Sequence, residues 1–318
     1  MSVSIIIPTY KNVEYLAELF LSIESNNFAD NSEILIGIDN CSETLEYVLS
    51  NRFPSNFKFY FFKQNYGPYI IKNTLYKLSS NNNILFFDSD DIMLSNYISE
   101  IDRLLEVYDC VKPKYINFKD GPTEKIFEKE TNVFGEGVFG MKKEIFESLN
   151  GFEGWRVAAD SDFMGRYYKT NPKLLHTKEV LFYRRLHPKS LTIHPDTNYT
   201  SHLRHQYFQI SKNKTQDMIK LEKMITGEYE EVSHDKKLYS IDEQFHLDEE
   251  TKEENQKNKK DQLNLFFSSR PKNVISNSDP AKLDYNKINI SSNVETFSNI
   301  NKAMKKAKLE NIKKNYRR

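Results

Sequence analysis

The stretch Ile84-Leu85-Phe86-Phe87-Asp88-Ser89-Asp90-Asp91 joins four apolar residues directly to three carboxylates. The apolar half predicts a strand buried inside a sheet. Residues two apart in extended backbone point to the same side, so Asp88 and Asp90 converge. Carboxylates this close repel one another unless a cation lies between them, and hard oxygen ligands suit Mg²⁺ or Mn²⁺. The alternative interpretation is a solvated acidic turn that caps the next helix.

Outward from this stretch, short β-rich runs alternate with segments of helical periodicity over the first two hundred residues. This alternation is typical of strands joined by crossover helices in a mostly parallel sheet, and it predicts an α/β fold with helices flanking the sheet. The expected strands are 2–7, 33–38, 58–62, 84–87 and 180–184. One expected helix follows the turn 8–12, one opens at Gly67-Pro68, and one follows Ser95. Two more are expected at 142–149 and from about 160.

Polar residues follow three of these strands: Thr9, Asp39 and Asp88. Open α/β sheets bind ligands outside the carboxyl ends of their strands, so we expect these side chains to line one crevice. Within it, Asp39 can accept the N3 hydrogen of a uracil, while Thr9 and Tyr10 can form walls around the base. Each of these residues taken singly also fits an ordinary turn, because turns are rich in Asp, Asn and Thr.

Two further segments border the expected crevice. The helix that opens at Gly67-Pro68 carries Lys72 and Asn73, which can lie along the nucleotide. The glycine-spaced stretch 134–140 predicts backbone that another group approaches closely, and it suits a wall on the acceptor side.

A glycine-rich loop, 151–159, leads to Asp160 at an expected helix start. This position suits a carboxylate that acts as a base toward a substrate hydroxyl. The alternative is that Asp160 only caps the helix.

The run 183–190 is basic and carries hydroxyl groups, so it can face a diphosphate. His187 can complete a metal shell, and Lys189 or Arg185 can neutralise phosphate. The alternative is a solvated basic surface.

Bulk composition narrows the class of protein. The 318 residues carry no net formal charge, which argues against attraction of the whole chain to nucleic acid or to an anionic membrane. Cys41 and Cys110 are the only cysteines, so a disulfide framework is not expected. The first apolar run has no basic residues before it, and no run of about eighteen apolar residues occurs. We therefore expect a cytoplasmic protein without a transmembrane segment.

The character of the chain changes beyond about residue 230, where Asn, Lys, Asp and Glu dominate. We expect the folded domain to span 1–200, a helical extension to follow over 201–230, and a charged low-complexity tail, partly helical or disordered, to occupy 231–318. The basic end, 302–318, can contact an anionic partner or lie as a solvated helix.

In their order and spacing, these motifs resemble those of family 2 glycosyltransferases, which have the GT-A (Rossmann-like) fold. The resemblance covers about residues 1 to 200 and rests on 3–12, Asp39, 65–67 with Lys72-Asn73, 88–91, 150–153, Asp160 and 185–190. The sequence departs from the family pattern at Lys72, where an arginine is usual, and at Ala159, where a glutamate usually precedes the catalytic aspartate.

The resemblance implies metal-dependent transfer of a sugar from a UDP-sugar to a hydroxyl acceptor with inversion, using Mn²⁺ or Mg²⁺. It implies that Asp160 is the general base and that Asp90 is the direct metal ligand, with Asp88 and His187 beside it. The residues expected to bind the donor are Pro8, Thr9, Tyr10, Asp39, Lys72, Asp88 and Ser89.

Two other classes of protein stay open. A sugar-phosphate nucleotidyltransferase would carry a glycine- and arginine-rich loop after its first strand, where this chain has 8–12. A non-catalytic module that binds glycans or nucleotide sugars is suggested by Ala159 and by the long charged tail. The expected acceptor is a glycan, a lipid-linked sugar, a protein or a modified nucleic acid.

Overall fold

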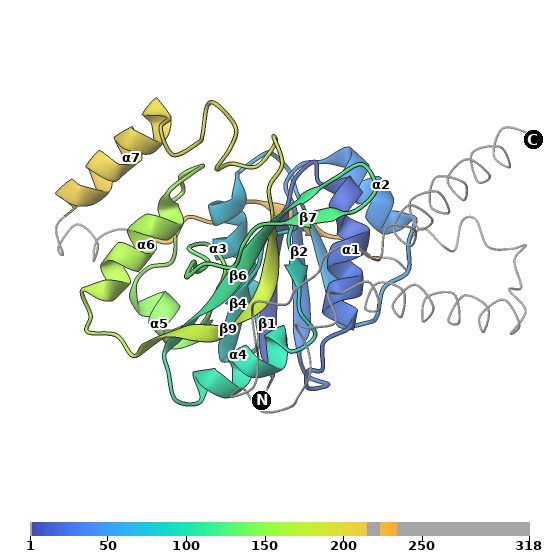
Figure 1. The fold of residues 1–318 in the computed structure, drawn as a ribbon, viewed down its shortest axis with the longest axis horizontal. Helices are drawn as coiled ribbons and strands as arrows, with labels where there is room; N and C mark the ends of the chain where they lie inside the picture. The colour runs from blue at the N-terminus through green and yellow to red at the C-terminus, as the bar shows by residue number, and fades with distance from the viewer. Residues whose placement is uncertain (1, 215–222, 234–318) are drawn as a thin grey trace, which may run out of the picture. The chain divides into compact units, whose positions relative to one another are not determined.

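Strand β1 (Val3–Thr9) is buried along its whole length near the middle of a β-sheet in the computed structural model, which describes residues 2–214 and 223–233 (Figure 1). The other strands of the sheet are β2 (Glu33–Ile38), β3 (Phe57–Phe62), β4 (Asn83–Phe86), β5 (Ile92–Met93), β6 (Cys110–Asp120), β8 (Phe139–Lys142), β9 (Leu174–Arg185) and β10 (Tyr229–Glu231). The helices are α1 (Val13–Glu24), α2 (Ser42–Leu49), α3 (Pro68–Leu78), α4 (Tyr97–Leu105), α5 (Lys143–Ser148), α6 (Ala159–Tyr168) and α7 (His202–Asn213).

The strand order of the sheet is β10-β3-β2-β1-β4-β8-β6-β9-β5. Neighbouring strands are parallel from β3 through β2 and β1 to β4, and β10 and β8 flank this set in antiparallel orientation. Beyond β8, the pair β6 and β9 is parallel again, while β5 runs antiparallel to β9. The predicted α/β class is therefore confirmed, with a parallel centre and mixed outer strands.

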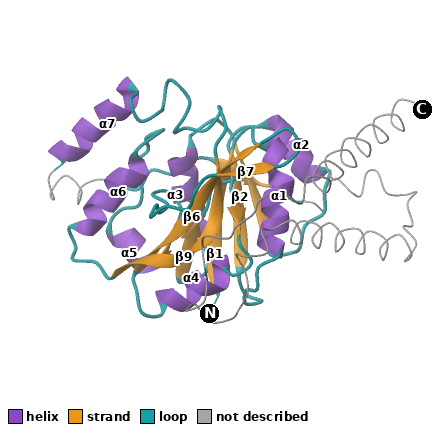
Figure 2. Cartoon of the chain, viewed as in Figure 1, coloured by secondary structure: helices purple, strands orange, loops and turns teal. Residues whose placement is uncertain are grey.

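Both faces of the sheet are covered by helices, which explains why its central strands are continuously apolar. Alternate residues of β1 point to opposite faces, so Ile5 and Ile7 pack with α1, α2 and α4, whereas Ile6 packs with α3, α5 and α6. Figure 2 shows the helices on either side of the strands. None of the helices within the described ranges combines the length and the apolar character needed to cross a bilayer.

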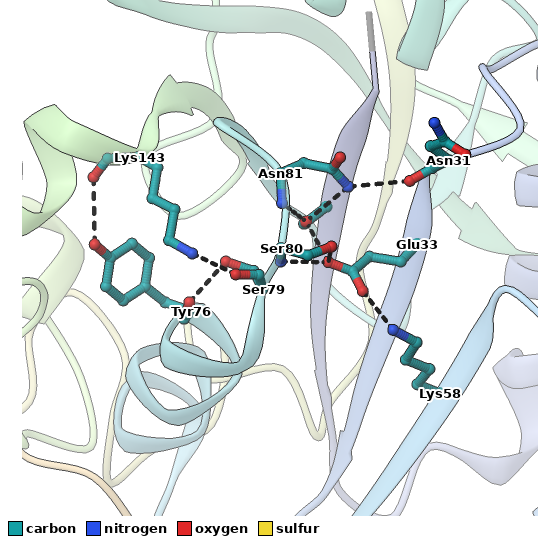
Figure 3. A network of polar contacts seen from close by, with 9 residues as sticks. Asn31, Glu33, Lys58, Tyr76, Ser79, Ser80, Asn81 and Lys143 are labelled. Atoms are coloured by element: carbon teal, nitrogen blue, oxygen red, sulfur yellow. Dashed lines mark hydrogen bonds and ion pairs between the residues drawn. The ribbon is translucent and has the colours of Figure 1, made fainter.

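A polar network ties together the amino ends of three parallel strands (Figure 3). At the start of β2, Glu33 is 4% exposed and its Oε1 accepts hydrogen bonds from Ser4 Oγ (2.7 Å) and Ser80 N (2.6 Å), while its Oε2 pairs with Lys58 Nζ at 2.7 Å. Burial acts to raise the pKa of Glu33, but the bonds from Lys58, Ser80 and Ser4 outweigh it and lower this pKa to about 2.

Several expected elements differ in extent. Strand β1 continues through Pro8 to Thr9, because the proline removes one possible hydrogen bond without ending the pairing, and Thr9 lies opposite Ile38. Helix α2 and strand β5 were not expected. The helix buries only Thr44 and Val48, so it lacks a wide apolar stripe, and the strand is two residues long.

The sheet also takes in residues beyond 200, since β10 pairs with β3. Residues 120–126 lie outside the compact unit that contains the sheet, and they include most of strand β7 (Lys125–Phe127). The predicted charged tail lies almost entirely outside the described residues, and the proposed domain boundaries and compartment stay predictions.

Candidate active site

A cavity of about 700 Å³ opens at the carboxyl ends of β1, β2 and β4. From β1 the chain proceeds to β2 and β3 on one side, whereas β4 lies on the other, and ligands of open α/β sheets bind at such a switch point. The cavity is lined by all ten residues that the resemblance implies for donor binding, the metal and the base: Pro8, Thr9, Tyr10, Asp39, Lys72, Asp88, Ser89, Asp90, Asp160 and His187. The structure thus brings together side chains that are separated by up to 179 positions in the chain.

Lys72 is a buried cation on α3 that reaches the acidic turn after β4. Its Nζ lies 2.9 Å from Asp88 Oδ1 and also donates to the carbonyl oxygen of Gly137 at 2.9 Å. Although 42% of the Asp88 side chain surface is accessible, the surrounding protein desolvates its carboxylate and raises its pKa, and the Lys72 charge opposes this rise. Lys72 therefore holds both the acidic turn and the glycine-spaced loop.

Asp90 and His187 contact each other in the cavity lining. Asp90 Oδ2 lies 2.7 Å from His187 Nε2, and the main-chain oxygen of Asp90 accepts a hydrogen bond from Arg185 Nε at 2.8 Å. Nδ1 of His187 is buried and has no hydrogen-bond partner among the described residues. A carboxylate and an imidazole within hydrogen-bond distance form a donor pair that fits a divalent cation.

The third carboxylate of the turn, Asp91, binds the backbone instead of His187. Its Oδ1 accepts the backbone N–H of Arg185 at 2.9 Å, and burial, together with the charges of Asp90 and Asp88, raises its pKa well above the ordinary range. Within residues 2–214 and 223–233, no group of three or more His, Cys, Asp or Glu side chains converges as a complete metal cage. The donor pair therefore suits a cation whose remaining ligands come from substrate phosphate or water.

Asp39 anchors the loop that precedes α3. Its Oδ1 accepts the N–H of Tyr66 at 2.7 Å and its Oδ2 accepts the N–H of Gly67 at 3.0 Å. Burial raises the pKa of Asp39, while these two bonds and the charge of Arg156 act against the rise. Gly67 has φ of 83°, a left-handed conformation that favours glycine, so the sequence allows this turn.

Asp160 lies in the first turn of α6 and lines the cavity. Its Oδ1 accepts the N–H of Ser161 at 2.9 Å, and a Cβ added to Gly137 would lie 3.3 Å from its Oδ2. The glycine-spaced loop therefore passes close to Asp160, as its composition predicts. Before it, Ala158 adopts φ of 65°, and Ala159 is fully buried among apolar residues.

Asp162, two residues further, serves a different purpose. It is buried and pairs with Arg166, whose Nε lies 2.9 Å from Asp162 Oδ2, while Ser211 donates to Asp162 Oδ1 at 2.6 Å. Arg166 also donates to the carbonyl oxygens of Leu149 and Gly151. Asp162 is absent from the cavity lining; it ties α6 to α7 through Ser211 and holds Arg166, which binds the loop carbonyls.

Two expectations from the sequence are wrong. Asn73 does not lie along the cavity, because it is fully buried and exchanges two hydrogen bonds with the backbone of Phe152 (2.7 and 2.9 Å). Arg185 is not available to a phosphate, because its side chain is 2% exposed and its Nη2 lies 2.5 Å from Glu18 Oε2. Asn73 instead holds the backbone of Phe152, and Arg185 holds the main-chain oxygen of Asp90.

The cavity lining also contains residues that the sequence did not single out. Tyr69 on α3 is one, and burial raises its pKa well above the ordinary value, with a further rise from the neighbouring Asp160 and an opposing effect of Arg204. Arg204 on α7 and the segment 191–199 are others. The sequence offered little signal for Arg204 and 191–199, because both follow the last recognisable motif.

Comparison with known proteins defines the family. The family model for Glycosyl transferase family 2 matches residues 4–170, which is more than half of the chain. The chain therefore belongs to glycosyl transferase family 2, as its motifs predict.

Two curated relatives are glycosyltransferases that act on different acceptors. The GalNAc(5)-diNAcBac-PP-undecaprenol beta-1,3-glucosyltransferase of Campylobacter jejuni is 27% identical over 214 residues, which cover 61% of this chain and 68% of that protein. The poly(ribitol-phosphate) beta-N-acetylglucosaminyltransferase TarS of Staphylococcus aureus is 26% identical over 140 residues, which cover 42% of this chain and 24% of TarS. The matched region is thus only a quarter of the TarS chain.

Solved structures agree on the fold. Residues 1–349 of S. aureus TarS in complex with UDP-GlcNAc give a TM-score of 0.51 at 19% identity, with 60% of each chain covered. Mannosyltransferase PcManGT from Pyrobaculum calidifontis in complex with GDP-Man and Mn²⁺ gives 0.50 at 13% identity, with 69% of this chain and 68% of that chain covered. These likenesses confirm the predicted GT-A fold.

Proposed function

We propose that this family 2 glycosyltransferase transfers a sugar from a UDP-sugar to a hydroxyl acceptor with inversion at the anomeric carbon. The observation that carries the proposal is that Asp160, the Lys72–Asp88 pair and the Asp90–His187 pair line one cavity. A volume of about 700 Å³ is in the range of small-molecule sites.

The donor nucleotide is proposed to lie over the ends of β1 and β2. Thr9 Oγ1 is buried there without a hydrogen-bond partner in the described part of the chain, so it can bond to a base. Asp39 keeps lone pairs for the N3 hydrogen of uracil, and Pro8, Tyr10 and Ser89 complete the wall. The UDP-GlcNAc bound in a TarS structure supports a uridine donor.

In the proposed reaction, Asp160 takes the proton of the acceptor hydroxyl, whose oxygen attacks the anomeric carbon. The bond from that carbon to the β-phosphate oxygen breaks, and the nucleoside diphosphate leaves with the bonding pair. A sugar hydroxyl is a poor nucleophile at neutral pH, so a positioned base is required. A single displacement of this kind inverts the configuration.

Asp90 and His187, with Asp88 beside them, would hold Mn²⁺ or Mg²⁺. When bound, such a cation supplies positive charge that stabilises the departing diphosphate. Lys72 contributes a fixed cation on the same side, because its Nζ is held by Asp88 and the Gly137 carbonyl.

The acceptor is proposed to be a glycan, a lipid-linked sugar, a protein or a modified nucleic acid, and the C. jejuni relative acts, by its name, on a lipid-linked one. The proposal also includes contact of the basic segment 302–318 with an anionic partner.

The test is release of nucleoside diphosphate from a panel of UDP-sugars, with GDP-mannose as comparison, in the presence and absence of Mn²⁺. We expect slow hydrolysis of one UDP-sugar by the wild type and UDP binding that Asp39→Ala weakens. Binding of UDP-sugars with no hydrolysis or transfer under any condition would favour a non-catalytic binding module, for which Ala159 is the supporting feature.

A further inference from the structure

Three of the Lys and Arg residues that line the cavity are neutralised by a carboxylate. Lys72 pairs with Asp88 at 2.9 Å, Arg185 with Glu18 at 2.5 Å, and Lys189 with Glu14 at 2.7 Å. The other four, Lys11, Arg156, Arg184 and Arg204, form no ion pair with a carboxylate within residues 2–214 and 223–233. Lys11 follows β1, and Arg156 donates to Asn65 Oδ1 at 2.7 Å in the loop that Asp39 anchors, so both lie beside the proposed nucleotide site. Arg184 and Arg204 come from β9 and α7 instead.

The Arg184 guanidinium is bound only to neutral oxygens. Nη2 donates to Thr192 Oγ1 at 2.6 Å, and Nη1 lies 3.4 Å from Asn117 Oδ1, while Tyr115 lies beneath the guanidinium with its ring centre 5.8 Å away. Burial acts to lower the pKa of Arg184, but Asp91 and the nearby phenols raise it, so the group stays charged. A guanidinium has five donors, and the remaining ones suit an anionic oxygen.

The Arg204 guanidinium is almost fully buried and organises the loop before α7. Its Nε donates to the carbonyl of Thr197 at 3.0 Å and its Nη2 donates to the same oxygen at 2.9 Å, while the ring of Tyr199 lies 5.1 Å away. Backbone carbonyls thus occupy Nε and Nη2 without cancelling the charge, and Nη1 has no hydrogen-bond partner among the described residues. Thr197 Oγ1 is buried beside it and has no hydrogen-bond partner in the described residues.

Arg184 and Arg204 together form a cationic wall, which lies on the acceptor side of the cavity. Arg184 is at the end of β9, which is separated from β1 by β4, β8 and β6, whereas the proposed nucleotide site is over β1 and β2. Arg204 Nη2 lies 3.4 Å from the carbonyl oxygen of Leu191, and Arg184 donates to the next residue, Thr192, so the two guanidinium groups hold adjacent residues of the cavity lining. A group bound at this wall therefore lies in the cavity that Asp160 also lines.

We propose that Arg184, Arg204 and Thr197 form a subsite for a phosphate group carried by the acceptor. The inference rests on the proposed function, because it names the class of acceptor for that same site. Phosphate fits better than a carboxylate, since two guanidinium groups match its double charge and Thr197 supplies a hydroxyl donor. Tyr199, which is 64% exposed, lies at the outer edge, where it can contact a sugar ring.

The test is calorimetric titration of glucose 6-phosphate, glucose and glucuronate into the full-length protein saturated with UDP, so that the donor phosphate site is filled. We expect glucose 6-phosphate to bind, with glucose and glucuronate at least about tenfold weaker. Arg184→Gln should weaken glucose 6-phosphate about tenfold and Thr197→Val should weaken it less, both without changing the affinity for UDP.

Arg103→Gln is the matched control, because Arg103 on α4 is 63% exposed and pairs with Glu100 away from the cavity lining. Equal binding of glucose and glucose 6-phosphate would overturn the subsite, and equal binding of glucuronate would overturn its assignment to phosphate. Loss of UDP affinity in Arg184→Gln would mean that this residue binds the donor. If the protein binds no UDP at all, the proposed function fails, whereas glucose 6-phosphate binding can still be measured alone.

Discussion

His187 Nε2 lies 2.7 Å from Asp90 Oδ2, although 97 positions separate the two residues in the chain. The contact joins the acidic turn after β4 to the basic run after β9. If this pair holds a divalent cation, His187→Gln should weaken the binding of Mn²⁺ about tenfold or more, and EDTA should lower the affinity for UDP.

Electron paramagnetic titration of Mn²⁺ measures the first effect directly. His205→Gln, on the exposed face of α7, is the control and should bind Mn²⁺ as the wild type does. Unchanged Mn²⁺ binding in His187→Gln would remove this histidine from the metal site.

Gly137 is the point of closest approach between the loop and the proposed base. An added Cβ would lie 3.3 Å from Asp160 Oδ2 and 3.6 Å from Lys72 Nζ. The distance to Lys72 is an ordinary van der Waals contact, so we expect Gly137→Ala to shift the Asp160 carboxylate alone, by a few tenths of an ångström. The transfer rate should fall by roughly tenfold, because a proton-transfer geometry tolerates little displacement.

Gly165→Ala is the matched control for this substitution. Apart from the adjoining residues and the backbone of α6 itself, no atom lies within 4 Å of a Cβ built at Gly165. This variant should transfer at the normal rate and unfold at a slightly higher temperature, since alanine stabilises a helix by about 0.4–1 kcal/mol relative to glycine. Equal rates for both glycine variants would mean that the loop does not position Asp160.

The Glu33 network predicts a dependence of stability on pH. Glu33 has a pKa of about 2 in the folded protein against an ordinary value of 4.5, so the folded state favours its charged form. This contribution is fully present above about pH 4.5 and is lost as the pH falls toward 2. It amounts to on the order of 3 kcal/mol.

Urea unfolding of the wild type and Glu33→Gln between pH 3 and pH 7 measures the contribution. The free energy of unfolding of the variant should lie below that of the wild type at pH 7, and the two should converge toward pH 3. A difference that does not change with pH would show that the network acts through shape alone.

Asp162 is predicted to stabilise the fold rather than to take part in catalysis. It is buried and bound to Arg166 at 2.9 Å, so Asp162→Asn leaves a buried guanidinium without its counter-ion and should cost about 3–5 kcal/mol of unfolding free energy. Thermal unfolding measures this loss. A variant that unfolds normally but does not transfer sugar would instead give Asp162 a catalytic role.

The sequence predicted those site residues whose place in the fold follows from the strand or loop directly before them. Asp39 and Asp88 follow apolar strands, so their place at the sheet edge could be inferred from the chain alone. The glycine spacing around Gly137 likewise indicated a close approach, which the structure shows to involve Asp160 and Lys72.

The remaining parts depend on contacts between distant segments. Asn73 follows Lys72 directly and shares its motif, yet its side chain turns to the backbone of Phe152. Arg184 and Arg185 are neighbours on a strand, so they point to opposite sides, and only the fold decides which one meets Glu18. Arg204 lies outside every motif, and its burial follows from carbonyl groups that the loop before α7 presents.

The central claim is that Asp160 removes the acceptor proton, and the most direct measurement is the single-turnover transfer rate of Asp160→Asn at saturating donor. We predict a rate lower than that of the wild type by about two to four orders of magnitude, with unchanged affinity for UDP, because the asparagine keeps the shape but cannot accept the proton. Transfer by Asp160→Asn at the wild-type rate would contradict the account.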